Sequence, residues 1–203
     1  MINLNKHYTD LSTELLEIYP NGGRVIAYKS INYNTEDFRK ILCCASFFAK
    51  QGHLVTITPK LNATLKNPAY QNIYGKLLNT RYYGKCPDFE VNGIFYEHEG
   101  YQSSNMKKAF RNMLNHGSKQ SNRIIVDDCG LTTGYMLRSI ASRITIGIEI
   151  KEIWIRNGKN LHLLYKNWRP MIFHWPSAQR IRRIVNAKIQ LFFELARGVE
   201  NFL

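Results

Sequence analysis

The sequence is poor in acidic residues. Fifteen Asp and Glu stand against twenty-eight Lys and Arg, which gives a formal net charge of +13 over 203 residues. A basic excess of this size exceeds what solubility requires and is typical of proteins that bind a phosphate-bearing partner, although an anionic lipid surface would attract it too. Ten Phe, twelve Tyr and 44% hydrophobic residues allow a sizeable core and exclude a disordered chain. We therefore expect a folded protein that binds nucleic acid.

Cysteine is also sparse, and its placement excludes the common cysteine frameworks. Cys43 and Cys44 are adjacent while Cys86 and Cys129 stand alone, so no Cys-x-x-Cys pair marks a zinc site or a disulfide framework. We expect four free thiols in a reducing compartment. No run approaches eighteen apolar residues, and the first residues lack the basic start and apolar stretch of a signal peptide. These features predict a soluble protein without a membrane span.

The hydrophobic periodicity predicts an α/β (α+β) fold with a central mixed β-sheet. Two strands, 23–30 and 53–60, flank a helix that begins near Asn34 or Thr35 and ends at Gly52, which makes a βαβ-like unit. A short helix is expected over 68–79. We predict three regions: an N-terminal α/β extension over 1–80, a core over 81–170, and a C-terminal amphipathic helix over 171–203 that packs on the core.

Within the core, residues 85–168 predict the order ββαβαββ. The two strands before the first helix flank Asn92-Gly93, and the last two turn at Asn157-Gly158. The first helix is expected to be capped by Ser103 or Ser104 and to stop at Gly117. A buried strand over 122–128 and a helix over 131–144 complete this region.

Four of the fifteen acidic residues lie in one short segment, KCPDFEVNGIFYEHEG, residues 85–100. If Asn92-Gly93 forms a two-residue type I′ turn, Asp88 lies opposite Glu97 in the hairpin. Because alternate residues of a strand point to opposite faces, one face then carries Asp88, Glu90, Glu97 and Glu99. The other face carries Phe89, Val91, Ile94, Tyr96 and His98, which we expect to pack in the core.

Like charges directly opposite one another destabilise a sheet, so the acidic face needs an explanation. Either it is exposed to solvent, or Lys85, Lys107 or Arg123 neutralises it, or it binds a metal ion or a proton. Mg²⁺ is commonly held by one or two carboxylates with water and substrate phosphate, and it activates water for attack on a phosphodiester. Alternatively, a crowded carboxyl group keeps its proton and serves as a general acid or base. The residues alone leave these alternatives open.

The segment PDFEVNGIFYEHEG, the helix after it, KQSNRIIVDD, a second helix and the paired strands IKEIWIRNG and NLHLLYK form a recognisable pattern. Over about residues 80–168 it resembles the C-terminal tRNase-type domain of CdiA contact-dependent growth inhibition toxins, in the barnase/colicin/RelE-like nuclease group. In that pattern an Asp-bearing strand, a turn, a strand with Glu-x-Lys and a helix precede a Gln and an apolar strand. Asp88, Glu97 and Gln120 occupy the matching places.

The resemblance implies a bacterial toxin-like ribonuclease that acts on RNA, most directly on tRNA, and needs no cofactor. It also implies an acidic immunity protein as a partner, and action in the cytoplasm, reached by delivery into a target cell if the chain is a toxin fragment. A small-molecule ligand is not expected.

One departure from the pattern concerns Glu99, which stands where the pattern has Lys two residues after Glu97. The stretch is also similar to the metal-dependent PD-(D/E)xK nucleases, in which Asp and Glu bind Mg²⁺ and the Lys positions water. That alternative implies a Mg-dependent DNase with the metal at Asp88, Glu97 and Glu99. A third alternative is a non-catalytic nucleic-acid-binding accessory protein of a mobile element.

These alternative functions predict the candidate site residues. As catalytic residues we expect the three carboxylates, together with Lys119 reaching across from a helix end and His162 on a late strand: Asp88, Glu97, Glu99, Lys119 and His162. As nucleic-acid-binding residues we expect Lys85, Lys107, Arg123, Arg138, Arg143 and Lys166.

Overall fold

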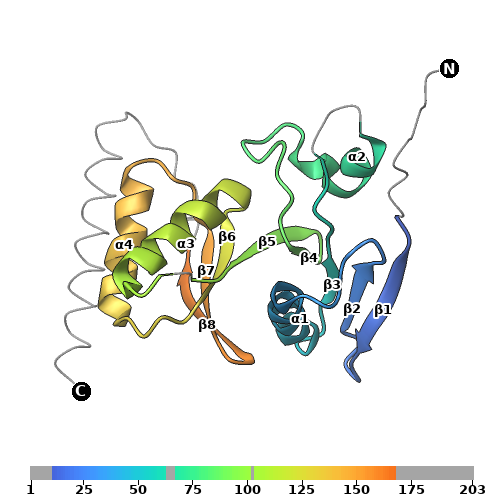
Figure 1. Ribbon diagram of the computed structural model, residues 1–203, viewed down its shortest axis with the longest axis horizontal. Helices are drawn as coiled ribbons and strands as arrows, with labels where there is room; N and C mark the ends of the chain where they lie inside the picture. Colours follow the sequence, from blue (N-terminus) through green and yellow to red (C-terminus); the bar gives the residue numbers. More distant parts are fainter. Residues whose placement is uncertain (1–10, 63–66, 102, 168–203) are drawn as a thin grey trace, which may run out of the picture.

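A computed structural model describes residues 11–62, 67–101 and 103–167 (Figure 1). The predicted C-terminal helix lies outside the described residues. Within them, eight strands form one sheet: β1 (Thr13–Ile18), β2 (Arg24–Tyr28), β3 (Leu54–Ile57), β4 (Phe89–Val91), β5 (Ile94–Glu99), β6 (Arg123–Asp127), β7 (Glu152–Asn157) and β8 (Asn160–Lys166). The helices are α1 (Glu36–Ala49), α2 (Pro68–Tyr74), η1 (Gly75–Leu77), α3 (Met106–Gln120) and α4 (Thr133–Thr145).

The strands lie in the sheet in the order of the chain, and their directions make the sheet mixed. The pairs β2–β3, β5–β6 and β6–β7 are parallel and are joined through α1, α3 and α4, whereas the other neighbours are antiparallel. The predicted α+β class, the βαβ unit and the order ββαβαββ are therefore confirmed. β1 was not predicted from the sequence. The sheet is continuous from the N-terminal region into the core.

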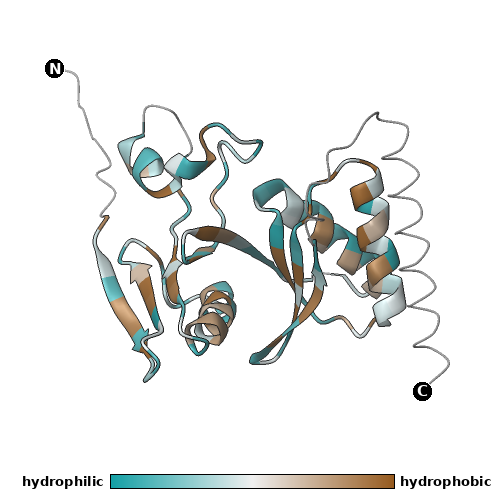
Figure 2. Ribbon diagram, turned by 180° about the vertical axis from the view of Figure 1, so that it is seen from behind, coloured by the Kyte–Doolittle hydropathy of each residue, from teal (hydrophilic) through white to brown (hydrophobic). Residues whose placement is uncertain are grey.

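The two faces of the sheet carry separate apolar cores, because neighbouring residues of a strand point to opposite sides. On one face α1 packs against β2, β3 and β4, with Phe48, Phe89 and Tyr96 in its core. On the opposite face α3 packs against β5 and β6, and α4 packs against α3 and β8, with Phe110 and Ile124 in their core. Figure 2 shows hydrophobic residues concentrated along the strands and the helices that cover them. Within the described residues, no helix is both long and apolar enough to cross a bilayer.

The turn between β4 and β5 has the predicted two-residue form. Asn92 and Gly93 both have positive φ, 46° and 85°, as a type I′ turn requires. Val91 accordingly pairs with Ile94, and the next residues follow in the predicted register. The register fixes which side chains of β5 share a face, so Phe95, Glu97 and Glu99 lie on the face opposite to Tyr96 and His98.

Three predicted boundaries are wrong: the start and the end of α3, and the turn of the last hairpin. α3 begins after Asn105, whose side chain accepts a hydrogen bond from the Lys108 amide, and it continues past Gly117 to Gln120. Gly117 permits close packing instead of ending the helix, since a Cβ there would lie 2.5 Å from Cγ2 of Ile124. The last hairpin turns one residue later than predicted, at 158–159, with Asn157 paired to Asn160.

Candidate functional site

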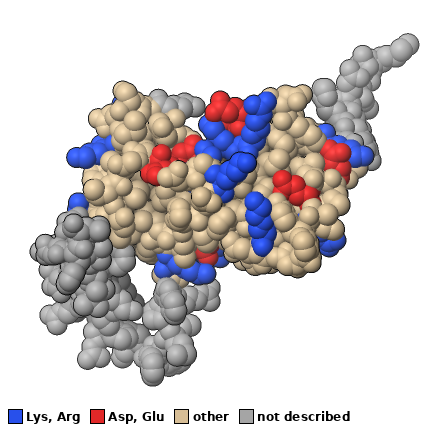
Figure 3. All heavy atoms as spheres, turned by 90° about the horizontal axis from the view of Figure 1, so that it is seen from below, with Lys and Arg blue, Asp and Glu red and all other residues tan. Residues whose placement is uncertain are grey.

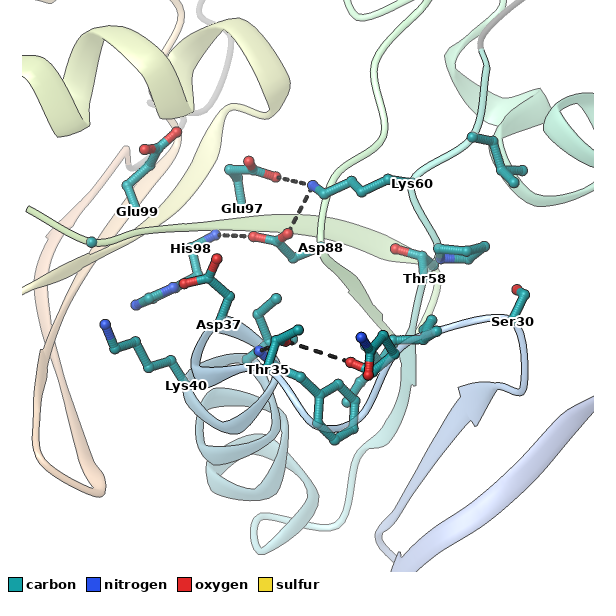
Figure 4. Close-up of a pocket in the computed structure, with 18 of the residues that line it drawn as sticks. Ser30, Thr35, Asp37, Lys40, Thr58, Lys60, Asp88, Glu97, His98 and Glu99 are labelled. Atoms are coloured by element: carbon teal, nitrogen blue, oxygen red, sulfur yellow. Dashed lines mark hydrogen bonds and ion pairs between the residues drawn. The ribbon is translucent and has the colours of Figure 1, made fainter.

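A cavity lies where β4 ends before β5 does. β4 covers only residues up to Tyr96 of its neighbour, so the later part of β5 pairs with β6 on one side and has no ladder partner in β4 on the other. The cavity of about 830 Å³ occupies this gap, between the end of β5, the residues that follow β3, and the first turn of α1. Figure 4 shows Glu97 and Glu99 on one side of β5 and His98 on the other.

Asp88 uses its two carboxylate oxygens differently. Oδ2 accepts a hydrogen bond of 2.8 Å from the backbone amide of His98, and so takes the place that the next residue of β4 would fill. Oδ1 lies 2.8 Å from Nζ of Lys60. The same ammonium donates to the Cys86 carbonyl at 2.7 Å and lies 3.8 Å from Oε2 of Glu97. Asp88 and Glu97 are 5% and 6% exposed, so Lys60 joins two buried carboxylates (Figure 4).

Lys60 reaches this place because of the pairing between β3 and β4. Ile57 pairs with Phe89, and the amide of Thr58 donates to the Asp88 carbonyl, which carries the chain after β3 alongside Asp88. Lys60 was not among the residues predicted from the sequence. Its only signal there is a Lys at the end of a predicted strand, and that signal acquires meaning once β3 is known to neighbour β4.

Burial and the charge of Asp88 raise the pKa of both carboxyl groups of β5, because too little positive charge lies nearby to compensate. Burial raises the pKa of Glu97 well above its ordinary value, the charge of Asp88 raises it further, and Lys60 offsets only part of this. Oε2 of Glu97 is buried and has no hydrogen-bond partner among the described residues. Burial, and then Asp88, raise the pKa of the half-buried Glu99 to about 7. Glu99 is therefore partly protonated near neutral pH.

The opposite face of β5 carries a different polar group. Nε2 of His98 lies 2.8 Å from Oδ1 of Asp127, and Nε of Arg156 donates to the same oxygen at 2.6 Å. Burial raises the pKa of Asp127, but the hydrogen bonds from His98 and Arg156 outweigh it and bring the pKa to about 2. We expected His98 to pack among apolar residues. Its side chain is indeed only 6% exposed, but it lies in this polar network at the edge of the cavity.

The structure brings together some of the predicted residues and separates others. Asp88, Glu97 and Glu99 line the cavity, whereas Glu90 forms an ion pair with Lys76 elsewhere. Lys119 and His162 are exposed and do not line the cavity. The predicted nucleic-acid-binding residues do not line this cavity either: Lys85, Lys107, Arg123, Arg138, Arg143 and Lys166. Arg123 and Lys166 form ion pairs with Glu152, and Lys107 lies over the ring of Tyr135.

Within the described stretches, no group of three or more His, Cys, Asp or Glu side chains is arranged to hold a metal ion. A pair of carboxylates nevertheless matches the donor type that Mg²⁺ prefers when a substrate phosphate supplies further oxygens. Oε2 of Glu97 has no hydrogen-bond partner, which fits a ligand atom. At Asp88, however, Lys60 already supplies the positive charge, so a metal ion would compete with this ammonium.

No protein-family model matches the sequence, and no curated protein matches it significantly. Among solved structures, the chain is similar to the "CdiA-CT/CdiI toxin and immunity complex from Burkholderia pseudomallei". The identity is 15% over 77% of this chain and 98% of that chain, with a TM-score of 0.41. A similarity of this degree assigns no residue role to this chain.

Proposed function

We propose that the protein is a nuclease that cleaves phosphodiester bonds of RNA at the carboxylate cavity, with tRNA as the substrate of a toxin-like enzyme. The observation that carries the proposal is the contact of Lys60 with both Asp88 and Glu97 on the wall of an 830 Å³ cavity. A net charge of +13 supplies attraction for a polyanion. Figure 3 shows Lys and Arg side chains gathered near the middle of one face, beside Asp and Glu.

The unequal carboxyl groups suit general acid–base catalysis. Glu99, with its pKa at about 7, accepts the proton of the ribose 2′-hydroxyl as that oxygen attacks phosphorus. Glu97, whose raised pKa favours its protonated form, donates a proton to the 5′-oxygen as the phosphorus–oxygen bond breaks. The products are a 2′,3′-cyclic phosphate and a free 5′-hydroxyl. Lys60 stabilises the charge that develops on the phosphoryl oxygens, and Asp88 holds Lys60 in place.

A toxin-like enzyme of this kind would need protection from its own activity inside the cell that makes it. The proposal therefore includes an acidic immunity protein that covers the mouth of the cavity, because an acidic surface complements a basic one and speeds association. The nuclease itself would act in the cytoplasm of a target cell.

A second candidate is Mg²⁺-assisted cleavage, with DNA as the substrate. The unpartnered oxygen of Glu97 favours it, because carboxylate oxygens are magnesium ligands. Asp88 and Glu97 would hold the ion, whose chemistry is to polarise the phosphate and lower the pKa of bound water. Lys60 would then leave Asp88 and contact the substrate phosphate instead.

The test incubates the purified protein with total tRNA and with plasmid DNA, in Mg²⁺ or in EDTA. We expect RNA cleavage that persists in EDTA and ends in a cyclic phosphate, detected by mass spectrometry. Glu97→Gln should lower the rate on the order of 100-fold or more, since it cannot donate a proton in the same way. Glu149→Gln, a change in an exposed surface ion pair, should leave the rate unchanged.

The other outcomes identify the alternatives. Cleavage of DNA that EDTA abolishes would establish the second candidate in place of the first. Salt-sensitive binding of nucleic acid without cleavage of either substrate would leave a non-catalytic accessory protein, and in that case Glu97→Gln would not change binding.

A further inference from the structure

A second cavity of about 480 Å³ lies next to the carboxylate cavity. It is lined by residues from the ends of β6 and β7, among them Asp127, Asp128 and Arg156. Two residues, Lys40 and Tyr101, line both cavities. The two cavities therefore meet at one cationic and one aromatic side chain, and together they make a groove longer than the space beside the carboxylates.

Tyr101 is a large aromatic residue that the protein leaves 44% exposed. It lies two residues after Glu99, just past the end of β5, and it lines the carboxylate cavity together with this proposed general base. An exposed ring in a groove is the surface on which an unpaired nucleobase stacks, and stacking is tolerant of base identity because every base has a flat face.

Lys40 lies close to the same point. If Gly100 carried a Cβ, that atom would lie 3.9 Å from Nζ of Lys40. The ammonium is paired with Oε1 of Glu36 at 2.7 Å, but the Glu36 side chain is 77% exposed. Exposed pairs of this kind contribute little to stability, so a phosphate can replace Glu36 at small cost. Lys40 is therefore a cation available to a substrate strand.

The acidic residues of the second cavity are already bound within the protein. Asp127 accepts from His98 and Arg156. Asp128 accepts from the Gly130 amide and from the Asn157 side chain. These contacts satisfy both carboxylates internally and reduce their repulsion of a phosphate, which leaves Lys40 to meet the backbone of a strand.

We infer that Lys40 and Tyr101 form a binding subsite for one unpaired nucleotide adjacent to the scissile bond, with the base on Tyr101 and a phosphate on Lys40. This inference rests on the proposed nuclease function and narrows its substrate to a single-stranded segment. In a duplex each base is paired and stacked between its neighbours, so it cannot lie on a protein ring without being extruded.

The test measures binding separately from cleavage, by using Glu97→Gln protein as the parent for all variants. Fluorescence anisotropy compares a labelled single-stranded RNA with the duplex of the same sequence. We expect the single strand to bind tighter. Tyr101→Ala should weaken single-strand binding about 5- to 100-fold, while Tyr101→Phe, which keeps the ring, should stay within about twofold. Lys40→Gln should lower the slope of log K against log salt by about 0.7.

Tyr83→Ala is the matched control, because Tyr83 is 37% exposed and lines neither cavity; it should bind like the parent. Binding by Tyr101→Ala equal to that of the parent, or duplex binding as tight as single-strand binding, would overturn the subsite. Dependence on Tyr101 without any cleavage by the unmutated chain would retain the subsite and remove the nuclease. Cleavage at an unchanged rate by Tyr101→Ala would retain the nuclease and remove the subsite.

Discussion

The two faces of β5 hold acidic residues at similar depth and treat them in opposite ways. On one face Glu97 is 6% exposed and its pKa is raised well above the ordinary value. On the other face Asp127, on the neighbouring strand, is 8% exposed and its pKa falls to about 2. Burial opposes ionisation in both. The difference lies in the partners, since Asp127 has His98 and Arg156 to itself, whereas one Lys60 serves Asp88 and Glu97 together.

This contrast separates acidic residues that stabilise the fold from acidic residues that lower its stability. A buried carboxylate with matched donors stabilises the native state at neutral pH, whereas a buried carboxyl group short of compensating charge, such as Glu97, has a raised pKa and lowers the stability of the native state once it ionises. Groups of the second kind concentrate at functional sites. Single substitutions on either face of β5 test this contrast.

The largest effect is expected from Asp127→Asn. The change leaves Arg156, whose side chain is 14% exposed, without its negative partner. Breaking a fully buried pair typically costs about 3–5 kcal/mol of unfolding free energy, so for this partly exposed pair we expect a loss of about 2–3 kcal/mol. Urea denaturation at neutral pH measures it. Asp128→Asn is the matched control, because its partners are uncharged, and should cost about 1 kcal/mol. If the two variants lose equal stability, the ion pair is not what distinguishes this face.

An effect of opposite sign is expected from Glu99→Gln. The raised pKa of Glu99 means that the native protein loses stability as pH rises from the unfolded value near 4.5 to about 7. The variant lacks this loss, so it should match the native protein at low pH and become more stable through that window. Because Glu99 is only half-buried, we expect a gain on the order of 1 kcal/mol at about pH 8.

Thermal unfolding at several pH values measures the gain. A constant difference between the two proteins across this range would show that Glu99 titrates normally, and the contrast between the faces would then depend on Glu97 alone.

The smallest effect is expected from Glu36→Gln, which removes the exposed partner of Lys40. An exposed pair within one helix contributes little, so the midpoint of thermal unfolding should not change measurably. A clear loss of stability would mean that this pair is integral to the fold, and Lys40 would then be less available to a substrate.

Local sequence signals predicted the carboxylate face well. The Asn92-Gly93 turn set the register of its hairpin, and alternation along the strands then placed Asp88, Glu97 and Glu99 at one cavity. The signal was sufficient because a two-residue turn determines which residues pair. The order of helices and strands followed from hydrophobic periodicity, which is also a local property of the sequence.

Contacts between distant segments could not be predicted in this way. Lys60 depends on β3 lying beside β4, and the partners of His98 depend on β5, β6 and β7 lying in sequence across the sheet. Neither order of neighbouring strands can be recognised from the residue types at these positions. Gly117 misled for a related reason, since its role is set by Ile124 on β6 and not by its own helix.

The short length of β4 has a consequence for how such a site could arise and be altered. One carboxylate oxygen of Asp88 substitutes for a peptide group in the hairpin, while the other holds the lysine. At the opening in the sheet, a single side chain therefore both accepts from the strand and holds the cation of the site. Asp88→Asn would keep the acceptor for the His98 amide and lose the charge that holds Lys60. The strand geometry and the chemistry of the site can therefore be changed separately at this position.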